Sequence, residues 1–172
     1  MIIAISGTPG TGKTTLAEGL TERLGYHLID VNAVINEHEE LVIENDKERD
    51  TKIIDEDSLL EILKEKIETN KKGNKGIIID SHLSHMLDRG SIDVCIVLSC
   101  DLSILKKRLE ARGYNELKIE ENLEAEAFDE ILEEAKENGH DVISLRTDKD
   151  VDMRSLLEQI KGTHSSDRSD VP

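Results

Sequence analysis

A glycine-rich loop near the start of the chain separates a short apolar run from an amphipathic stretch. The run Met1–Ser6 (MIIAIS) has the composition of a buried strand, and residues 13–24 carry apolar side chains at helical spacing. Between them, Gly7–Thr15 (GTPGTGKTT) matches the pattern G-x-x-x-x-G-K-[ST]. A glycine-rich turn that contains a lysine by chance is the alternative, and the strand before the loop and the helix after it disfavour that alternative.

The residue types of this loop suit phosphate. Gly7, Gly10 and Gly12 allow backbone torsions and close approaches that a Cβ atom would block. The loop N–H groups can then surround a β-phosphate, and the N-terminus of the following helix adds positive potential. Lys13 can reach the β- and γ-phosphates, and the Thr14 hydroxyl can coordinate Mg²⁺. The loop predicts a nucleotide site without naming the reaction.

The rest of the chain alternates between short apolar runs and longer amphipathic segments, which predicts a doubly wound α/β domain. Strands that are apolar on both faces and separated by helices are typical of a parallel sheet covered on both sides. The chain has 172 residues, which suits one domain. The predicted strands are Met1–Ser6, His27–Ile29, Gly76–Asp80, Val94–Leu98 and Val142–Leu145, and the predicted helices cover residues 13–24, 58–70, 101–111, 119–135 and 151–161.

Two segments lack either periodicity. The acidic stretch His38–Asp50 has no clear helical or strand period, so we expect a mobile inserted segment there. The polar tail Gly162–Pro172 has no pattern either, and we expect it to be disordered.

An acidic residue ends the third apolar run. Ile77–Asp80 (IIID) has the form of the Walker B element, in which Asp80 holds Mg²⁺ through a water, because Mg²⁺ keeps several of its waters. The alternative is an aspartate that only caps the next turn. His82 follows two residues later and could orient a water or an acceptor phosphate at the γ-phosphate, or could be an ordinary surface histidine. A metal site formed by His82 and His85 lacks a third ligand.

Phosphoryl transfer also needs positive charge around the transferred group. The richest basic cluster contains Lys106, Lys107, Arg108 and Arg112, and the two arginines share a helix face at i and i+4. A solvated helix face is the simpler interpretation of the two lysines. For Arg112, which precedes Gly113 at a helix end, the functional interpretation is favoured.

The charge of the chain is strongly uneven. The formal net charge is −16, and the excess acid lies in two segments: residues 35–57 hold ten acidic and three basic residues, and residues 116–137 hold ten and two. Such a balance argues against a nucleic-acid coat protein, which needs a basic surface, and we expect no direct sequence-specific binding to nucleic acid. It permits a basic protein partner, because opposite fields steer association.

Other features indicate a soluble protein of the cytoplasm. Cys95 and Cys100 are too few for a disulfide framework and lack zinc spacing, so we expect structural thiols in a reducing compartment. The N-terminus lacks the charged and apolar regions of a signal peptide. No apolar run approaches the roughly 18 residues of a membrane span, so no membrane partner is expected.

The motifs together resemble the adenylate kinase isoenzyme six family, small archaeal and eukaryotic adenylate kinase-like NTPases linked to small ribosomal subunit assembly. The resemblance covers residues 1–160, and its most specific part is the RGYNE-x-K-x-x-x-N run. The matching pieces are Gly7–Thr15, Ile54–Leu59 (IDEDSL), Asp80-Ser81-His82 and Arg108–Phe128.

The resemblance implies a P-loop NTPase of the nucleoside monophosphate kinase type, with a five-stranded parallel sheet in a single domain over residues 1–161. It implies a monophosphate-binding segment at about 30–53, a lid at about 111–121, and a catalytic role for His82. It also implies Mg²⁺ with ATP, AMP as acceptor, and ATPase activity. Motifs and resemblance together assign nucleotide binding to Gly7, Gly10, Gly12, Lys13, Thr14, Thr15, Arg108 and Arg112, catalysis to Lys13, Asp80, His82 and Arg112, and the metal to Thr14 and Asp80.

The expected function is a broad-specificity nucleoside monophosphate kinase that assists late maturation of the small ribosomal subunit and contacts a basic ribosomal protein on the pre-ribosomal particle. Two departures from ordinary adenylate kinases favour an alternative. Val34–Glu44 contains no arginine or lysine to hold the AMP phosphate, and the usual Asp-Gly-x-Pro-Arg after the Walker B strand is absent. The alternatives are an ATPase-type assembly factor with little AMP kinase activity, and a small-metabolite kinase on the same fold.

Overall fold

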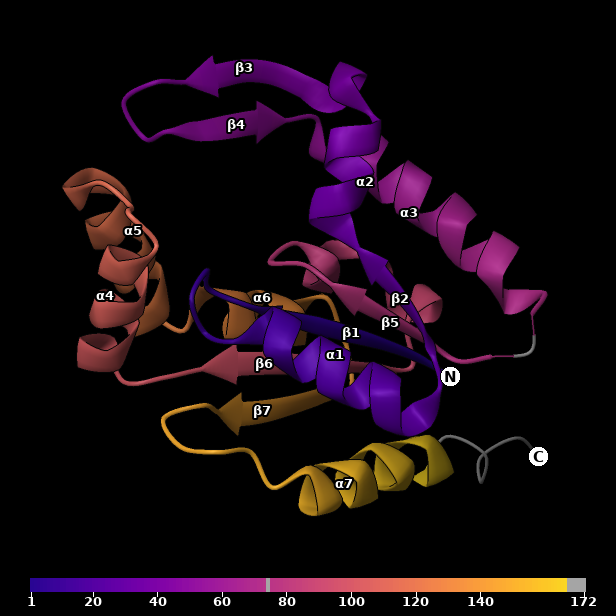
Figure 1. Ribbon diagram of the computed structural model, residues 1–172. Coiled ribbons are helices and arrows are strands. Elements are labelled where there is room, and N and C mark those ends of the chain that lie inside the picture. Colours follow the sequence, from indigo (N-terminus) through magenta and orange to yellow (C-terminus); the bar gives the residue numbers. More distant parts are fainter. Residues whose placement is uncertain (74, 167–172) are drawn as a thin grey trace.

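Five parallel strands form the central sheet of the computed structural model, which describes residues 1–73 and 75–166 (Figure 1). The order across the sheet is β2-β5-β1-β6-β7. The strand bounds are β1 (Ile2–Gly7), β2 (His27–Asp30), β5 (Ile77–Asp80), β6 (Val94–Ser99) and β7 (Val142–Arg146). All four neighbouring pairs run parallel. The predicted parallel α/β sheet and its five strands are confirmed.

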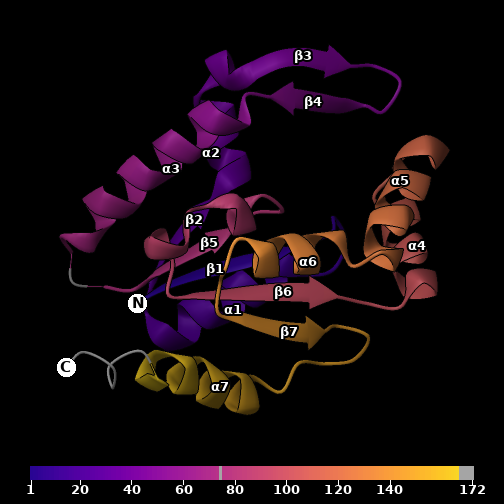
Figure 2. The ribbon, with the colours of Figure 1, turned by 180° about the vertical axis from the view of Figure 1, so that it is seen from behind.

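Alternate side chains of β1 enter two separate cores. Ile3 and Ile5 point to one face, where helices α1 (Lys13–Leu24) and α7 (Met153–Ser166) cover them. Ile2 and Ala4 point to the other face, beneath α3 (Glu56–Lys71) and α6 (Glu130–Glu137). Figures 1 and 2 show α1 on one side of the sheet and α6 on the other. Because both faces are covered, every residue of β1 is buried, as the continuous apolar run predicts.

Two helices lie beyond the carboxyl end of the sheet. Helix α4 (Leu102–Ala111) follows β6, and α5 (Glu116–Ala127) packs against it around a small core of its own that includes Leu105, Leu109 and Ile119. Figure 1 shows this pair at the edge where the strands β6 and β7 end. The helices therefore stand next to the glycine-rich loop, which leaves the sheet at the same edge.

The acidic stretch at 38–50 is ordered, so the expected mobile insert is wrong. Helix α2 (Val31–Glu37) and a short 3₁₀ turn (Glu39–Leu41) lead into strand β3 (Val42–Asp46), which pairs antiparallel with β4 (Thr51–Ile54). The two-stranded sheet projects over the carboxyl edge of the main sheet (Figure 1). Its strands are short and mostly solvated, so they carry no apolar alternation that a sequence pattern could reveal.

Two helix boundaries also differ from the expectation. The apolar stripe at 119–135 is split between α5 and α6, because Asp129 adopts a left-handed conformation with a φ of 52° and turns the chain. The last helix continues to Ser166, so residues 162–166 are helical rather than disordered. The rest of the expected disordered tail, 167–172, lies outside the described residues. Among the described residues, no helix is long and apolar enough to cross a membrane.

The fold makes a direct prediction at Gly7. Its φ is 135°, and a Cβ atom there would lie 2.4 Å from the carbonyl oxygen of Leu98 on the neighbouring strand. Gly7→Ala should lower the free energy of unfolding by about 2–4 kcal/mol, because alanine disfavours this backbone torsion and its Cβ atom would force β1 and β6 apart. Urea unfolding monitored by circular dichroism measures this loss.

Gly90→Ala is the matched control, because a Cβ atom at Gly90 meets nothing within 4 Å. Its unfolding free energy should stay within about 0.5 kcal/mol of the unsubstituted protein. Equal stability of the two variants would contradict the tight approach of β1 to β6 at Gly7.

Candidate functional site

The register of β1 and β5 brings the glycine-rich loop beside Asp80. Ile5 pairs with Asp80 across the two strands, and both strands end at the same edge of the sheet. The Thr14 hydroxyl, one residue into α1, donates to Asp80 Oδ2 at 2.7 Å. Asp80 is almost fully buried, and loss of water raises the pKa of its carboxyl, while the Thr14 hydrogen bond opposes this shift. The predicted partners Thr14 and Asp80 are thus in contact.

Lys13 folds back over the loop that precedes it. Its Nζ atom donates to the carbonyl oxygens of Gly7 at 2.6 Å and Thr8 at 3.1 Å. Burial lowers the pKa of Lys13 to about 8, although the negative charge of Asp80 opposes the shift. The ammonium is therefore charged at neutral pH and has little water around it, which strengthens its attraction for an anion in the loop.

Glycine allows the loop to contact helix α4. A Cβ atom at Gly10, where φ is 94°, would lie 2.9 Å from Leu105 Cδ1 and 3.1 Å from Leu109 Cδ2. Gly12 also has a positive φ, of 100°, and stands at the N-terminus of α1. The loop is consequently held between α1 and α4, and its shape depends on the packing of both helices.

Arg108 points to the backbone of the loop rather than into the open cleft. Its guanidinium donates to the carbonyl oxygens of Gly10 at 3.3 Å and Thr147 at 2.8 Å. The Thr147 hydroxyl in turn donates to the carbonyl oxygen of Thr11 at 2.7 Å. Arg108 and Thr147 therefore stabilise the loop through its main-chain oxygen atoms. Sequence reasoning missed Thr147, although a polar residue directly after the fifth strand was the available signal.

The two histidines after Asp80 have different environments. The His82 side chain is exposed at the cavity. The surrounding protein nevertheless removes water from its ring, which disfavours the protonated form, and the positive charges of Lys13 and His85 disfavour that form further. These effects lower the pKa of His82 to about 4, so the ring is neutral at pH 7. His85 is buried, with Nδ1 2.9 Å from the Ser6 hydroxyl and Nε2 2.8 Å from Glu134 Oε2. His85 thus connects β1 to α6 and holds the segment that carries His82.

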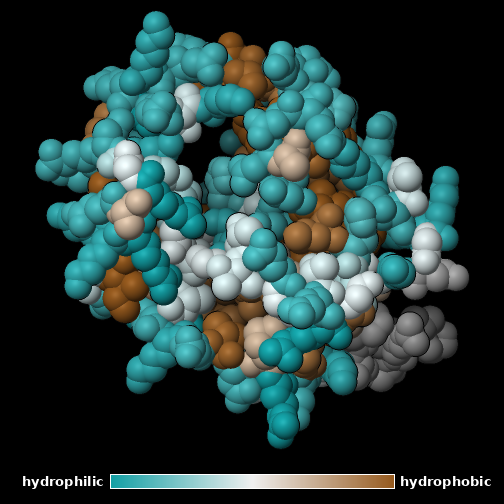
Figure 3. Space-filling model, in the orientation of Figure 1, coloured by the Kyte–Doolittle hydropathy of each residue, from teal (hydrophilic) through white to brown (hydrophobic). Residues whose placement is uncertain are grey.

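A cavity of about 750 Å³ lies above the carboxyl edge of the sheet, between the loop, the β3–β4 hairpin and helix α5. The space-filling view shows the molecule hollowed in this region, with a mainly hydrophilic rim (Figure 3). Of the sequence-predicted residues, the cavity wall includes Gly10, Gly12, Lys13, Thr14, Asp80, His82 and Arg112. Gly7, Thr15 and Arg108 are outside this wall, although Gly7 and Arg108 contact residues that shape it.

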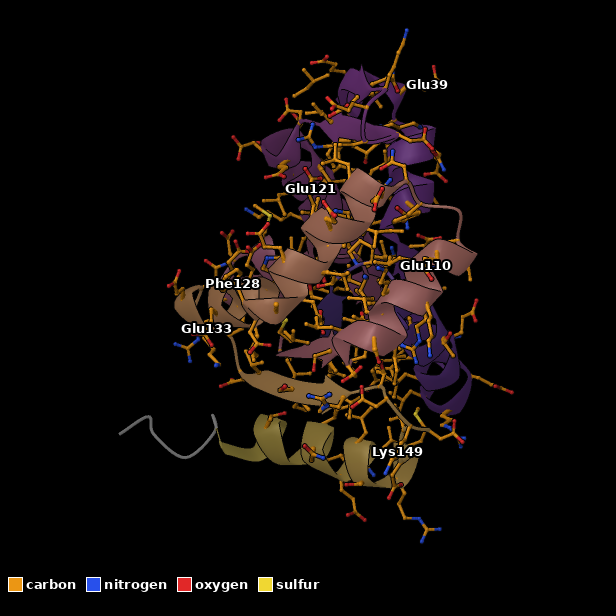
Figure 4. All side chains as sticks on the ribbon, turned by 90° about the vertical axis from the view of Figure 1, so that its left-hand side faces the viewer. Glu39, Glu110, Glu121, Phe128, Glu133 and Lys149 are labelled. Atoms are coloured by element: carbon orange, nitrogen blue, oxygen red, sulfur yellow. The ribbon has the colours of Figure 1, made fainter. Side chains whose placement is uncertain are left out.

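The hairpin meets helix α5 across the top of the cavity, a feature that no sequence pattern indicated. Arg49 Nε donates to Glu121 Oε1 at 2.8 Å, and its Nη1 pairs with Asp46 in the same hairpin. Asn115 and Lys118 donate to backbone carbonyl oxygens of the hairpin turn, at 2.8 and 2.9 Å. Glu121 lies on the part of α5 nearest the hairpin (Figure 4). The hairpin and α5 thereby enclose the cavity on the side opposite the loop.

The donor set at the end of β5 fits Mg²⁺. Thr14 and Asp80 present hard oxygen atoms 2.7 Å apart, and Mg²⁺ uses one or two protein oxygens with water and phosphate completing its shell. Among the described residues, no group of three or more His, Cys, Asp or Glu side chains is arranged to hold a metal. Cys95 and Cys100 are buried free thiols, and burial raises the pKa of Cys95 to about 12.

Comparison with known proteins adds relatives of similar length. A family model described as an AAA domain matches residues 3–129. The "Putative adenylate kinase" of Methanocaldococcus jannaschii is 37% identical over 99% of this chain and 91% of its own length. An adenylate kinase isoenzyme 6 homolog of Caenorhabditis elegans is 35% identical over 92% of this chain and 86% of its own. A gluconokinase from Sinorhizobium meliloti superposes with a TM-score of 0.56 at 16% identity, covering 95% and 90% of the two chains, and so shares the fold.

The environment of His82 predicts its titration. Because the folded-state pKa lies near 4 and the ordinary value is 6.5, the ring should stay neutral as the pH falls from 8 to 5. The unfolded chain binds the proton first, so the contribution of His82 to stability is present above pH 6.5 and is lost as the pH falls toward 4. NMR titration of the imidazole resonances, assigned with His82→Gln, measures the midpoint. A midpoint at or above 6.5 would contradict the desolvated environment.

Proposed function

The chain belongs to the adenylate kinase isoenzyme 6 family, and from that premise we propose that it is a nucleoside monophosphate kinase, which transfers the γ-phosphoryl group of ATP to AMP. One observation carries the proposal. The same cavity is lined by the phosphate-binding loop with Lys13 on one side and by cationic side chains of the hairpin on the other. Two anionic nucleotides need such an arrangement, because their phosphates repel each other unless positive charge lies around both.

On the donor side, the loop N–H groups and the Lys13 ammonium bind and orient the ATP phosphates, and Arg112 approaches from the end of α4. Mg²⁺, held through Thr14 and Asp80, supplies charge neutralisation on the phosphate oxygens when bound. The neutral ring of His82 can accept a hydrogen bond next to the transferred group. These roles agree with the residues that the sequence motifs single out.

The enclosing segments complete the proposal. Residues 30–53, which include α2 and most of the hairpin, would receive AMP, and residues 111–121 would act as the lid. The contact of Arg49 with Glu121 joins these two segments above the cavity. Exclusion of water by such closure favours transfer to AMP over hydrolysis, and incomplete closure would account for ATPase activity as a side reaction.

A coupled assay of ADP formation from ATP and AMP tests the proposal. The protein should form ADP at a rate that depends on AMP, and Lys13→Ala should reduce turnover about 100- to 1000-fold, because a charged donor to the transferred phosphoryl group is removed. Lys161→Ala, on α7 and away from the cavity, is the control and should retain turnover. ADP formation that is independent of AMP would show an ATPase instead.

A second function, docking of a basic protein, is favoured by the outer surface of α5. Glu120, Glu124 and Phe128 follow at intervals of four residues and therefore share one face of the helix. Both glutamates are exposed, and Phe128, the single phenylalanine of the chain, has 68% of its surface exposed. Figure 4 shows Phe128 at the end of α5 next to α6. We propose that this α5 stripe receives a basic small-subunit ribosomal protein on the pre-ribosomal particle.

Binding of a lysine- and arginine-rich ribosomal-protein tail peptide, measured by fluorescence anisotropy, tests this docking. Glu120→Lys with Glu124→Lys should weaken binding about tenfold or more, because the surface field is reversed, and added salt should weaken binding to the unsubstituted protein. Glu61→Lys with Glu65→Lys makes the same charge change on an exposed face of α3. Equal weakening by both double variants would indicate only non-specific attraction to the net charge.

A further inference from the structure

Helix α2, which forms part of the proposed acceptor side of the cavity, carries no cation. Helix α2 contributes Asn32, Ile35 and Asn36 to the cavity and no basic residue. A phosphate dianion is bound more strongly where a charged donor is present, because charge-assisted hydrogen bonds are about twice as strong as neutral ones. A cation from another element would therefore strengthen binding on this side.

Most cations of the cavity already have partners. The five basic residues in its wall are Lys13, Arg49, Lys52, Arg112 and Lys118. Arg49 is held in two ion pairs, with Asp46 and Glu121, and Lys118 donates to the carbonyl oxygen of Asp50 while it lies 4.3 Å from the centre of the Tyr114 ring. Lys13 belongs to the loop and Arg112 to the end of α4, both on the donor side. Lys52 is the cation that remains on the acceptor side.

Lys52 reaches from the hairpin to α2. Its Nζ atom lies 3.3 Å from Asn36 Oδ1, across two elements that are 16 residues apart in sequence. Among residues 1–73 and 75–166, no carboxylate lies within ion-pair distance of Lys52, and Asn36 is a neutral partner in a long hydrogen bond. Lys52 therefore has no direct ion-pair partner among these residues, and its exposed side chain lies at the cavity wall.

The pair provides two kinds of donor for one phosphate group. The Lys52 ammonium has three N–H donors and one is used by Asn36. The amide of Asn36 carries an NH₂ group on the same carbon as its oxygen, so a rotation about the terminal bond turns donors toward the same point in space. We propose that Lys52 and Asn36 bind the phosphate of the acceptor nucleotide, with Lys52 supplying the charge that α2 lacks. This inference rests on the proposed kinase function and names its acceptor subsite.

Variants of Lys52 test the subsite. Lys52→Met should raise the KM for AMP roughly 10- to 100-fold, because a charge-assisted hydrogen bond to the phosphate is lost. The KM for ATP should change much less, and Lys52→Arg should recover most of the affinity for AMP because the charge is retained. Lys47→Met is the matched control. It removes the same charge from the same hairpin, but Lys47 is outside the cavity wall, and its KM for AMP should stay within about twofold.

Direct binding separates recognition of phosphate from a structural role of Lys52. Calorimetry should show that Lys52→Met lowers the affinity for AMP. Adenosine, which lacks the phosphate, should bind the variant and the unsubstituted protein with equal affinity. Equal weakening of AMP and adenosine, or an unchanged affinity for AMP, would overturn the inference. If the unsubstituted protein forms no ADP from AMP, the proposed function fails, and the comparison of AMP with adenosine still decides whether Lys52 holds a phosphate. Matching circular dichroism spectra confirm that the variants are folded.

Discussion

The parallel pairing of β1 with β5 is the constraint on which the site depends. It places Asp80 opposite Ile5, so the residue that ends β5 stands beside the loop that begins at Gly7. A shift of one residue in this register would turn Asp80 to the other face of the sheet and break its 2.7 Å hydrogen bond with Thr14. On its other side β1 pairs with β6, and the close approach of Gly7 to Leu98 fixes β6 next to the start of the loop. Both contacts need buried, continuous apolar strands, which the covered sheet provides.

The cavity wall lacks the excess of acidic residues that the chain as a whole carries. The chain carries a net charge of −16, whereas the cavity wall holds five basic side chains and four acidic ones, Glu56, Asp80, Glu121 and Glu130. The acidic residues of the α5 stripe face away from it, whereas Glu121 turns toward the hairpin and pairs with Arg49. The cavity wall is therefore close to balanced in charge, whereas the exposed face of α5 that carries Glu120 and Glu124 is acidic. Salt screens exposed charges over short distances, so the cavity wall and the outer face of α5 can differ in charge.

The strands of the main sheet and the helices that pack on it could be predicted from the sequence. The β3–β4 hairpin, which lies away from that sheet, could not. The strands have apolar residues on both faces, and α1 has leucines at helical spacing, so local pattern and burial agree. The β3–β4 hairpin has mostly solvated side chains, and it is held to α5 by Asn115 and Lys118, which bind main-chain oxygens. Every residue type has such an oxygen, so no sequence pattern marks those contacts. The sequence also gives no sign that the helix is interrupted at Asp129, because apolar residues at helical spacing continue on both sides of it.

The sequence alone determined the order strand, phosphate-binding loop, helix, and the later strand that ends in Asp80, because these features are encoded in neighbouring residues. It also located Lys13, Thr14, His82 and Arg112, and the structure brings all four to one cavity. Only the tertiary structure decided that Arg108 contacts the loop at Gly10 and also binds Thr147, and that Lys52 of the hairpin reaches Asn36 of α2 at the cavity wall. The physical reason is that the direction of a long charged side chain is set by partners distant in sequence. Those partners come together only when the hairpin, α4 and the sheet have packed.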